Sequence, residues 1–350
     1  MSSHSNVKTK IMRKLLLLSA LLISTFVMAQ TNWTGAVSTD WTNNANWSNN
    51  SPGTEFYGDL ITIPSSLSTY PVLSDDLLLT GNISIESGAT LTITTPGAST
   101  NPGSIRFLAG ATIANNGQVI LNSGTAIKLN TAVTGSGNFK YNRNLPVANV
   151  FYAMGSPVAG QDIDAFIAAE PIPQSSSNSN MGIGTYNTSS DDYTYILSGA
   201  SSSGSFTPGK GYLVRVNAIG DVSFTGSNPT VADITAGLTY TDNRYNLLSN
   251  PYPAHLKSGS DGFLGSNSSR VDGTVWTWNA ANSEYDTNVL ADGIIIAPAQ
   301  GFYVRAKSSG SGNFTFKNSF LRADNTDNFK NTVEDRFEVH LNISDESINR

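Results

Sequence analysis

FTPGKGYLVRVNAIGDVSFTG at residues 206–226 and IAPAQGFYVRAKSSGSGNFTF at residues 296–316 are the two stretches that decide the fold. Six positions match, or carry conservative replacements, at a constant offset of 90. In the first stretch they are Pro208, Gly211, Tyr212, Val214, Arg215 and Phe224, and in the second Pro298, Gly301, Phe302, Val304, Arg305 and Phe314. A constant offset over this length indicates a duplicated unit.

The segments upstream of these stretches also correspond. FYAMGSPVAGQDIDAFI, which begins at Phe151, aligns with YNLLSNPYPAHLKSGSDGFL, which begins at Tyr245, and places Pro157 opposite Pro251. TYNTSSDDYTYIL and TVWTWNAANSEYDTNVL lie between the matched segments, and each predicts a hairpin with an Asn-rich turn. We therefore predict two β-rich copies, at residues 145–235 and 236–322. Each opens with a strand and a Pro turn and closes with a hairpin.

The region before the copies has a different pattern. From Leu77 to Tyr141, short strands alternate apolar and polar residues, and the tripeptide Gly-Ala-Thr recurs at Gly88 and Gly110, each time before such a strand. Alternation with frequent turns favours stacked rungs. We predict a β-solenoid over residues 77–144, with a β-sandwich sheet as the alternative.

The predicted fold class is all-β: a short β-solenoid or β-sheet segment followed by two tandem, pseudo-repeat, β-sandwich-like units. Helical periodicity is nearly absent, and only Ile163 to Glu170 could form helical turns.

Residues 30–76 contain three tryptophans, Trp33, Trp41 and Trp47, among polar turn formers. Two interpretations compete. An exposed aromatic platform would stack on sugar rings, whereas a cap would bury the indoles over the open end of the strand stack. We favour the cap, because an open stack end must be covered and tryptophan buries a large area.

The two ends of the chain carry further signals. Four basic residues, an apolar run from Leu15 to Val27 and a small residue at Ala29 predict a signal peptide over residues 1–29. The alternative is a single-pass anchor, but the run is short for a membrane span. Residues 323–350 are predicted to be a linker followed by a strand from Phe337 to Ile343, and we expect the natural chain to continue beyond Arg350.

Composition restricts the possible partners. Removal of the predicted leader leaves 16 basic against 26 acidic residues, a balance of about −10. Nucleic acid and anionic lipid are poor partners for such a surface. The chain has no cysteine, which excludes a disulfide framework, a thiolate nucleophile and a thiolate metal site.

Several of these segments resemble those of secreted and cell-surface proteins of Bacteroidota. The similar motifs are the tryptophan segment WTGAVSTDWTNNANW, an SSPV-like segment GSPVAG, a GNPYPS-like segment at Ser249 to Ala254, and the closing motif PAQGFYVRA. The resemblance implies export by a type IX secretion system, contact with that secretion machinery, and roles in surface adhesion and carbohydrate contact. The C-terminal sorting domain expected of such proteins is not visible after VHLNISD.

Catalytic and cofactor motifs are weak. Gly204 to Lys210 matches a phosphate-binding loop only up to its lysine, and a strand follows where a helix should begin. His255 and His340 lie far apart and are expected at surface or edge positions, so a zinc site or a His-based triad is not predicted. We predict no metal, no cofactor and no catalytic residue.

Paired acids could in principle support glycosidase or lyase chemistry. The candidates are Asp75 with Asp76, Asp162 with Asp164, and Asp191 with Asp192. Each pair lies in a turn-rich context, where aspartate is favoured for hydrogen bonding to the backbone. Calcium at the third pair is not supported by a calcium-loop motif.

Aromatic residues are the remaining candidates for a binding site: Trp276, Trp278 and Tyr285 around the turn of the second copy, and Tyr193 and Tyr195 in the first. Trp276 and Trp278 are two apart on one strand and so share a face, which is a stacking platform if exposed and core if buried. We predict a non-enzymatic secreted or cell-surface protein that binds a glycan or a protein. The alternatives are a polysaccharide-active enzyme or its accessory module, and a structural spacer.

Overall fold

The computed structural model describes residues 30–52, 60–95, 103–108, 110–199, 202–280, 282–291 and 293–323. Strands dominate these residues, and the α-helices α2 (Ile163–Ala169) and α3 (Phe263–Ser266) are short. The predicted all-β class is confirmed. The predicted signal peptide at residues 1–29, His340 and the predicted strand near the C-terminus lie outside the described residues. Within them, no helix has the length and apolarity needed to cross a membrane.

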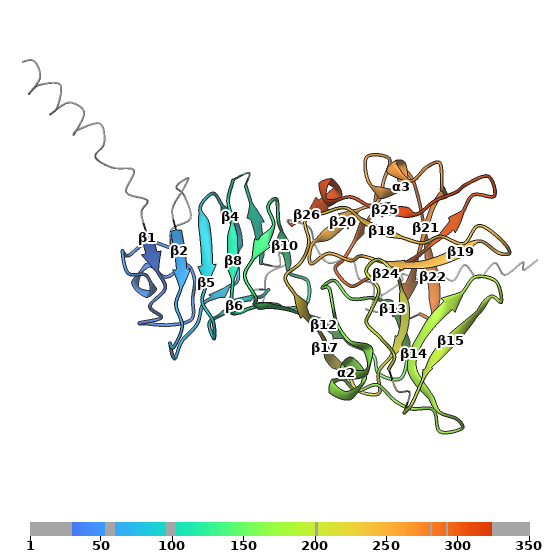
Figure 1. Cartoon of the computed structure of the whole chain (residues 1–350), viewed down its shortest axis with the longest axis horizontal. Coiled ribbons are helices and arrows are strands. Elements are labelled where there is room, and N and C mark those ends of the chain that lie inside the picture. Colours follow the sequence, from blue (N-terminus) through green and yellow to red (C-terminus); the bar gives the residue numbers. More distant parts are fainter. Residues whose placement is uncertain are drawn as a thin grey trace, which may run out of the picture.

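The described residues between Gln30 and Leu145 form a stack of parallel ladders, drawn in blue to green in Figure 1. From β2 onward, successive strands join the three ladders in rotation, so every turn of chain lies on the previous one. The first ladder is β1 (Gln30–Asn32), β2 (Leu60–Ile63), β5 (Asn82–Ile85), β8 (Ile113–Asn115) and β11 (Val133–Thr134). The second is β3 (Val72–Leu73), β6 (Thr90–Ile93), β9 (Gln118–Leu121) and β12 (Asn138–Leu145); the third is β4 (Asp76–Leu79), β7 (Ser104–Phe107) and β10 (Ala126–Lys128).

The alternating sequence explains why these strands stack. Inward side chains pair in register between turns, as Leu91, Val119 and Phe139 do, and all three are fully buried. The recurring Gly-Ala-Thr marks the bend before a strand, since Gly88 and Gly110 have φ values of +84° and +91°, which favour glycine.

The three N-terminal tryptophans lie at the β1 end of the stack. Trp33, Trp41 and Trp47 are only 1–2% exposed, and Trp47 makes edge contacts with the other two at centroid distances of 5.1 and 4.8 Å. The Trp33 indole N–H donates to the carbonyl of Thr69. Burial of all three indoles excludes the exposed platform and confirms that these residues are packed structurally.

The two matched regions each form a four-stranded sheet. The first sheet has the order β13 (Phe151–Met154), β16 (Tyr212–Arg215), β14 (Asn180–Asn187), β15 (Asp192–Leu197). The second sheet has the order β19 (Tyr245–Ser249), β24 (Gly301–Ala306), β21 (Val271–Asn279), β22 (Glu284–Val289). Both orders are first, last, second and third along the chain, so matched sequence segments occupy equivalent strands.

The remaining strands pair outside the two four-stranded sheets. β12 pairs in parallel with β9 of the stack and antiparallel with β17 (Gly220–Ser227), so a strand assigned to the stack also pairs with the first copy. In the second copy β25 (Phe314–Phe316) pairs instead with β18 (Ile234–Ala236). A further sheet contains β20 (His255–Lys257), β23 (Ile295–Ile296) and β26 (Leu321–Arg322), and the 3₁₀-helices are η1 (Asn44–Asn46) and η2 (Asn318–Phe320).

The first and second sheets meet through reciprocal contacts. Met154 forms an antiparallel bridge with Gln300, while Lys210 forms one with Leu248. In the sequence correspondence Met154 is equivalent to Leu248, and Lys210 to Gln300. Contacts that are exchanged in this way define a two-fold relation between the partners.

The backbone hydrogen bonds repeat this exchange. Gly155 N donates to Ala299 O, and its equivalent Ser249 N donates to Gly209 O, each at 3.0 Å. Gly209 and Ala299 are themselves equivalent, and both have left-handed backbones, with φ of +78° and +65°. The two sheets are therefore related by a local pseudo-two-fold axis that passes close to Gly155 and Ser249.

Candidate functional site

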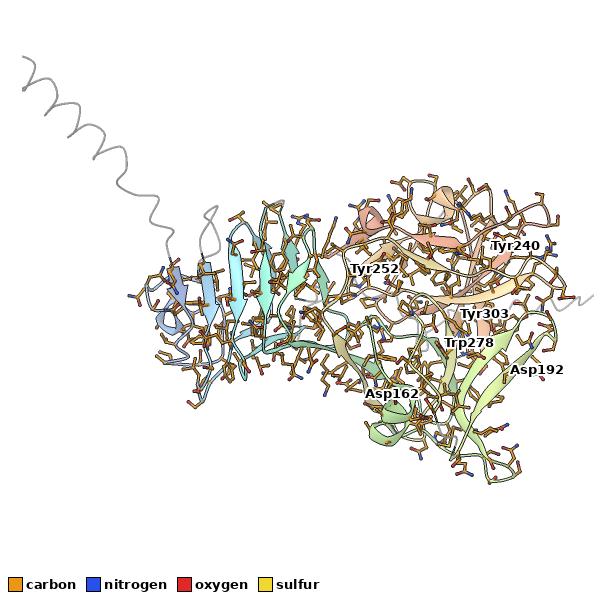
Figure 2. The ribbon with its side chains drawn as sticks, viewed as in Figure 1. Asp162, Asp192, Tyr240, Tyr252, Trp278 and Tyr303 are labelled. Atoms are coloured by element: carbon orange, nitrogen blue, oxygen red, sulfur yellow. The ribbon has the colours of Figure 1, made fainter. Side chains whose placement is uncertain are left out.

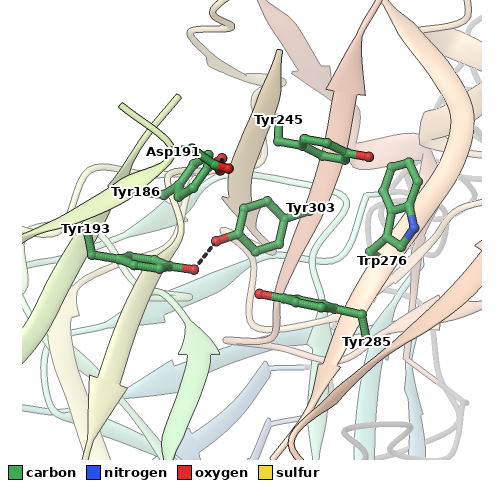
Figure 3. Close-up of a pocket in the computed structure, with 7 residues that line it drawn as sticks. All are labelled: Tyr186, Asp191, Tyr193, Tyr245, Trp276, Tyr285 and Tyr303. Atoms are coloured by element: carbon green, nitrogen blue, oxygen red, sulfur yellow. Dashed lines mark hydrogen bonds between the residues drawn. The ribbon is translucent and has the colours of Figure 1, made fainter. Parts of the chain in front are cut away.

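A cavity of about 350 Å³ opens between the first and second sheets. We call it the aromatic cavity, and Figure 3 shows the residues that line it: Tyr186, Asp191, Tyr193, Tyr245, Trp276, Tyr285 and Tyr303. Six of the seven are aromatic, and Asp191 is the one charged side chain in this lining. The size falls within the range of small-molecule sites, about 300–1,000 Å³.

The lining comes from both sheets. The β14–β15 hairpin supplies Tyr186, Tyr193 and Asp191, while β19, β21, β22 and β24 supply the other four side chains. Strand register places these groups together, because Tyr186 lies opposite Tyr193 in one hairpin and Trp276 lies opposite Tyr303 between β21 and β24. The aromatic cavity thus depends on the packing of one copy against the other.

The aromatic rings meet mostly edge to face. Tyr303 lies between Tyr186 and Tyr285, at centroid distances of 5.2 and 5.6 Å and interplanar angles of 88° and 87°. The rings of Tyr245 and Trp276 meet at 5.3 Å and 75°. Tyr303 is 6% exposed whereas Tyr285 is 45% exposed, so the cavity has a buried floor and an accessible mouth.

Most of the phenol hydroxyls already have partners. The Tyr186 hydroxyl donates to Asp191 Oδ1 at 2.5 Å, and the side-chain amide of Asn243 donates to both of these oxygens at 2.6 and 2.7 Å. The hydroxyls of Tyr193 and Tyr303 bond to each other across the two sheets, as the dashed line in Figure 3 shows. The free surface inside the cavity is therefore mainly ring carbon.

Burial controls the ionisation of these phenols. It raises the pKa of Tyr303, Tyr285 and Tyr186 well above the ordinary value of 10, and it raises the pKa of Tyr193 as well. The negative charge of Asp191 adds to the increase at Tyr186. These four phenols therefore stay neutral over the physiological pH range.

Three of the predicted site residues line the aromatic cavity: Tyr193, Trp276 and Tyr285. Trp278 lies beside it, 4.8 Å from Tyr285, and its indole N–H donates to the carbonyl of Phe151 at 2.7 Å. Trp276 and Trp278 are half-buried between the sheets, so they form neither an open platform nor a fully buried core.

Tyr195 lies apart from this group. Its ring is 6.1 Å from that of Phe151, and it lines a separate hollow with Arg215. The sequence interpretation also missed Tyr186 and Tyr245 as well as Tyr303, which lies inside the closing motif PAQGFYVRA. For Tyr186 the sequence offered a signal, because the register of the predicted hairpin places it opposite Tyr193.

Five of the six paired aspartates do not enter the aromatic cavity. Asp162 caps helix α2 by accepting from Ala165 N, Asp164 accepts from Ser203 N, and Asp192 accepts from the adjacent Tyr193 N. Figure 2 shows Asp162 at α2 and Asp192 on the β14–β15 hairpin.

Asp76 accepts from the Ser104 hydroxyl in the stack, and its neighbour Asp75 lies with it beside a hollow of the stack. Asp191 differs, since its carboxylate lines the aromatic cavity.

Two further features were considered for nucleotide or metal binding, the phosphate-loop-like segment and His255. The phosphate-loop-like segment ends in a turn followed by strand β16, as predicted. The expectation that His255 is a surface or edge residue is wrong, because it is fully buried on β20, the central strand of its sheet. Within the described ranges, no group of three histidine or acidic side chains is close enough to hold a metal ion.

The GNPYPS-like segment also stabilises the fold. The side-chain amide of Asn250 donates to the carbonyls of Ala254, Ile296 and Ala297. The buried Tyr252 hydroxyl accepts from Ile234 N and lies 2.9 Å from two backbone carbonyls. Both side chains are committed to fixing the turn after β19.

Comparison with known proteins gives one family and no described activity. A family model described as a domain of unknown function (DUF8693) matches residues 32–291, from the β1 end of the stack through strand β22. No curated protein and no solved structure matches this chain.

Proposed function

Since the chain belongs to the DUF8693 family, which is defined without an activity, we propose from its own residues that it is a secreted or cell-surface binding protein without catalytic activity. The aromatic cavity is its ligand site. The observation that carries the proposal is the convergence of six aromatic side chains from two sheets around an accessible space.

The lining supports binding better than catalysis. Proton transfer needs groups that change charge near the working pH. The aromatic cavity offers one carboxylate, Asp191, and four phenols whose pKa values are raised by burial. Buried aromatic faces, by contrast, supply large contact areas at a small cost in side-chain entropy.

The setting of the site supports a role outside the cell. The predicted leader precedes the described region, and the remaining chain is acidic and lacks cysteine. The parallel stack extends from the sheets that carry the aromatic cavity (Figure 1). It would hold the ligand site away from Gln30, the first described residue.

The decisive variant is Tyr303→Leu. The equivalent position in the first sheet is Leu213, so leucine fits this strand position, while the floor of the aromatic cavity is removed. We expect a ligand found on a glycan array or in a calorimetric panel of small molecules to bind the wild-type mature chain saturably. The Tyr303→Leu variant should bind it at least tenfold more weakly.

Tyr195→Leu is the matched control, because Tyr195 lies outside the aromatic cavity and is partly exposed. It should leave the affinity unchanged. Equal binding by wild type and Tyr303→Leu would refute the assignment of the site. Hydrolysis of a polysaccharide by the purified chain would refute the absence of catalysis.

A further inference from the structure

The shape and chemistry of the aromatic cavity identify a class of ligand. We propose that it binds an alkylated ammonium group, such as a trimethylammonium head, held against several ring faces and next to the Asp191 carboxylate. This inference rests on the proposed function and specifies its ligand. It depends on three features of the lining.

The first feature is the arrangement of the rings. A sugar ring is best covered by one or two flat faces, whereas a compact cation can be approached by ring faces from several directions. Tyr186 and Tyr285 stand nearly perpendicular to Tyr303, and Tyr245 and Trp276 form another near-perpendicular pair. Ring faces attract cations through their quadrupole, and a group of such faces is the known means of recognising quaternary ammonium.

The second feature is the charge of the lining. Asp191 is the one charged group among the lining residues, and its Oδ1 is held by Tyr186 and Asn243. Arg305 does not line the space, but its guanidinium lies 5.7 Å from the centre of the Tyr245 ring. That contact shows that a ring of this wall already accepts a cation.

The third feature is the shortage of free hydrogen-bonding groups. The hydroxyls of Tyr193 and Tyr303 bond to each other, and that of Tyr186 has two partners. A sugar, a bare ammonium or a metal ion each needs several polar partners to replace its hydration. An alkylated ammonium needs few, because its methyl groups present carbon to the rings while its charge remains.

The test compares choline with 3,3-dimethyl-1-butanol, which has the same shape but no charge, by calorimetry on the mature chain. We expect choline to bind at least tenfold more tightly, and ammonium chloride to compete weakly. Phosphatidylcholine vesicles form a separate arm: binding to vesicles and choline alike indicates a head group on a surface, and binding to choline alone indicates a free ligand. Both results support the proposal.

Three variants separate ring faces from hydroxyls and charge. Tyr303→Phe keeps the ring and should change choline affinity less than threefold, whereas Tyr303→Leu should reduce it more than tenfold. Asp191→Asn preserves the hairpin, because asparagine tolerates the left-handed backbone seen at Asp191. It should weaken choline binding several-fold and leave the neutral isostere unaffected.

The outcomes distinguish the two proposals. Equal affinity for choline and its neutral isostere, or no binding of either, overturns the cation assignment. If a neutral glycan then binds and Tyr303→Leu abolishes that binding, the aromatic cavity remains the ligand site and only its ligand class is wrong. If no probe is sensitive to Tyr303→Leu, both proposals fail.

Discussion

The first and second sheets have the same strand order and exchange the same backbone contacts, yet only one side of their interface contains the aromatic cavity. The difference lies in a few equivalent positions. Leu213 in the first sheet corresponds to Tyr303. Gly184 corresponds to Trp276, because each lies in the fourth residue pair from its hairpin turn. The shared positions build the interface, while the unequal positions Tyr303 and Trp276 add aromatic rings on one side of it.

Other equivalent positions keep the same character in both sheets. Tyr193 and Tyr285 occupy the same place in strands β15 and β22, and each contacts the aromatic residue paired with it. Arg215 lies over Phe151 at 5.9 Å, just as Arg305 lies over Tyr245. These matched pairs show that the unequal positions are local departures within an otherwise symmetric interface.

The largest effect is expected where the symmetry requires glycine. A Cβ at Gly301 would lie 2.6 Å from the backbone carbon of Ala153, and one at its equivalent Gly211 would lie 2.6 Å from Leu248 O. Backbone cannot move aside as a side chain can, so Gly301→Ala should lower the free energy of unfolding by about 3 kcal/mol. Urea denaturation measures the change.

Gly273→Ala in strand β21 of the same sheet is the matched control. Its Cβ would meet Leu290 Cβ at 3.5 Å, an ordinary contact. The free energy of unfolding should stay within about 0.5 kcal/mol of wild type, as for most open surface positions. A similar loss in both variants would mean that the packing of the sheets does not cause the effect.

The second prediction exchanges the residues at the pseudo-two-fold axis. A Cβ at Gly155 would lie 2.2 Å from Ser249 Oγ, although the two positions are equivalent. Only one of them has room for a side chain, so Gly155→Ser should cost about 2 kcal/mol of unfolding free energy. Adding Ser249→Gly should recover more than half of that loss, and a double variant no better than the single one would contradict the axis. Thermal and urea unfolding of both variants would show this.

Whether a feature of the fold or of the site could be predicted from the sequence depends on how far apart in the chain its contacting residues lie. Alternation predicts the strands of the stack, because burial of every second side chain is a local property, as at Leu91 and Val119. The repeat offset predicts which strands are equivalent. The aromatic cavity could not be predicted, since Tyr186 and Tyr303 meet only through the packing of one sheet on the other. His255 was misjudged for the same reason, because its burial depends on strands β23 and β26.

The third prediction concerns alkaline pH. Burial raises the pKa of the Tyr303 phenol above its ordinary value of 10, so the folded state holds this proton more tightly than the unfolded state. The resulting stability is fully present below pH 10 and is lost as the pH rises further, by at most about 1.4 kcal/mol per pH unit for one group. Between pH 10 and 11, the unfolding free energy of wild type should fall with pH more steeply than that of Tyr303→Phe, by about 1 kcal/mol per pH unit. Between pH 7 and 9 the two proteins should differ by a constant amount, and identical slopes above pH 10 would disprove the effect.

The smallest effect is expected at the turn before β24, where the two copies differ by one methyl group. Ala299 is fully buried with φ of +65°, and its equivalent Gly209 has φ of +78°. A left-handed alanine is strained by about 1–2 kcal/mol, while replacement by glycine loses a buried methyl, about 0.8 kcal/mol, and gains chain entropy on unfolding. These contributions nearly cancel, so Ala299→Gly should change the free energy of unfolding by less than about 0.5 kcal/mol.

The control is Ala297→Gly, because Ala297 is equally buried but has no left-handed backbone. This change should lower the free energy of unfolding by about 1–2 kcal/mol. Equal losses in the two variants would show that the left-handed turn stores no strain, and that alanine suits this turn in the second copy as well as glycine suits it in the first.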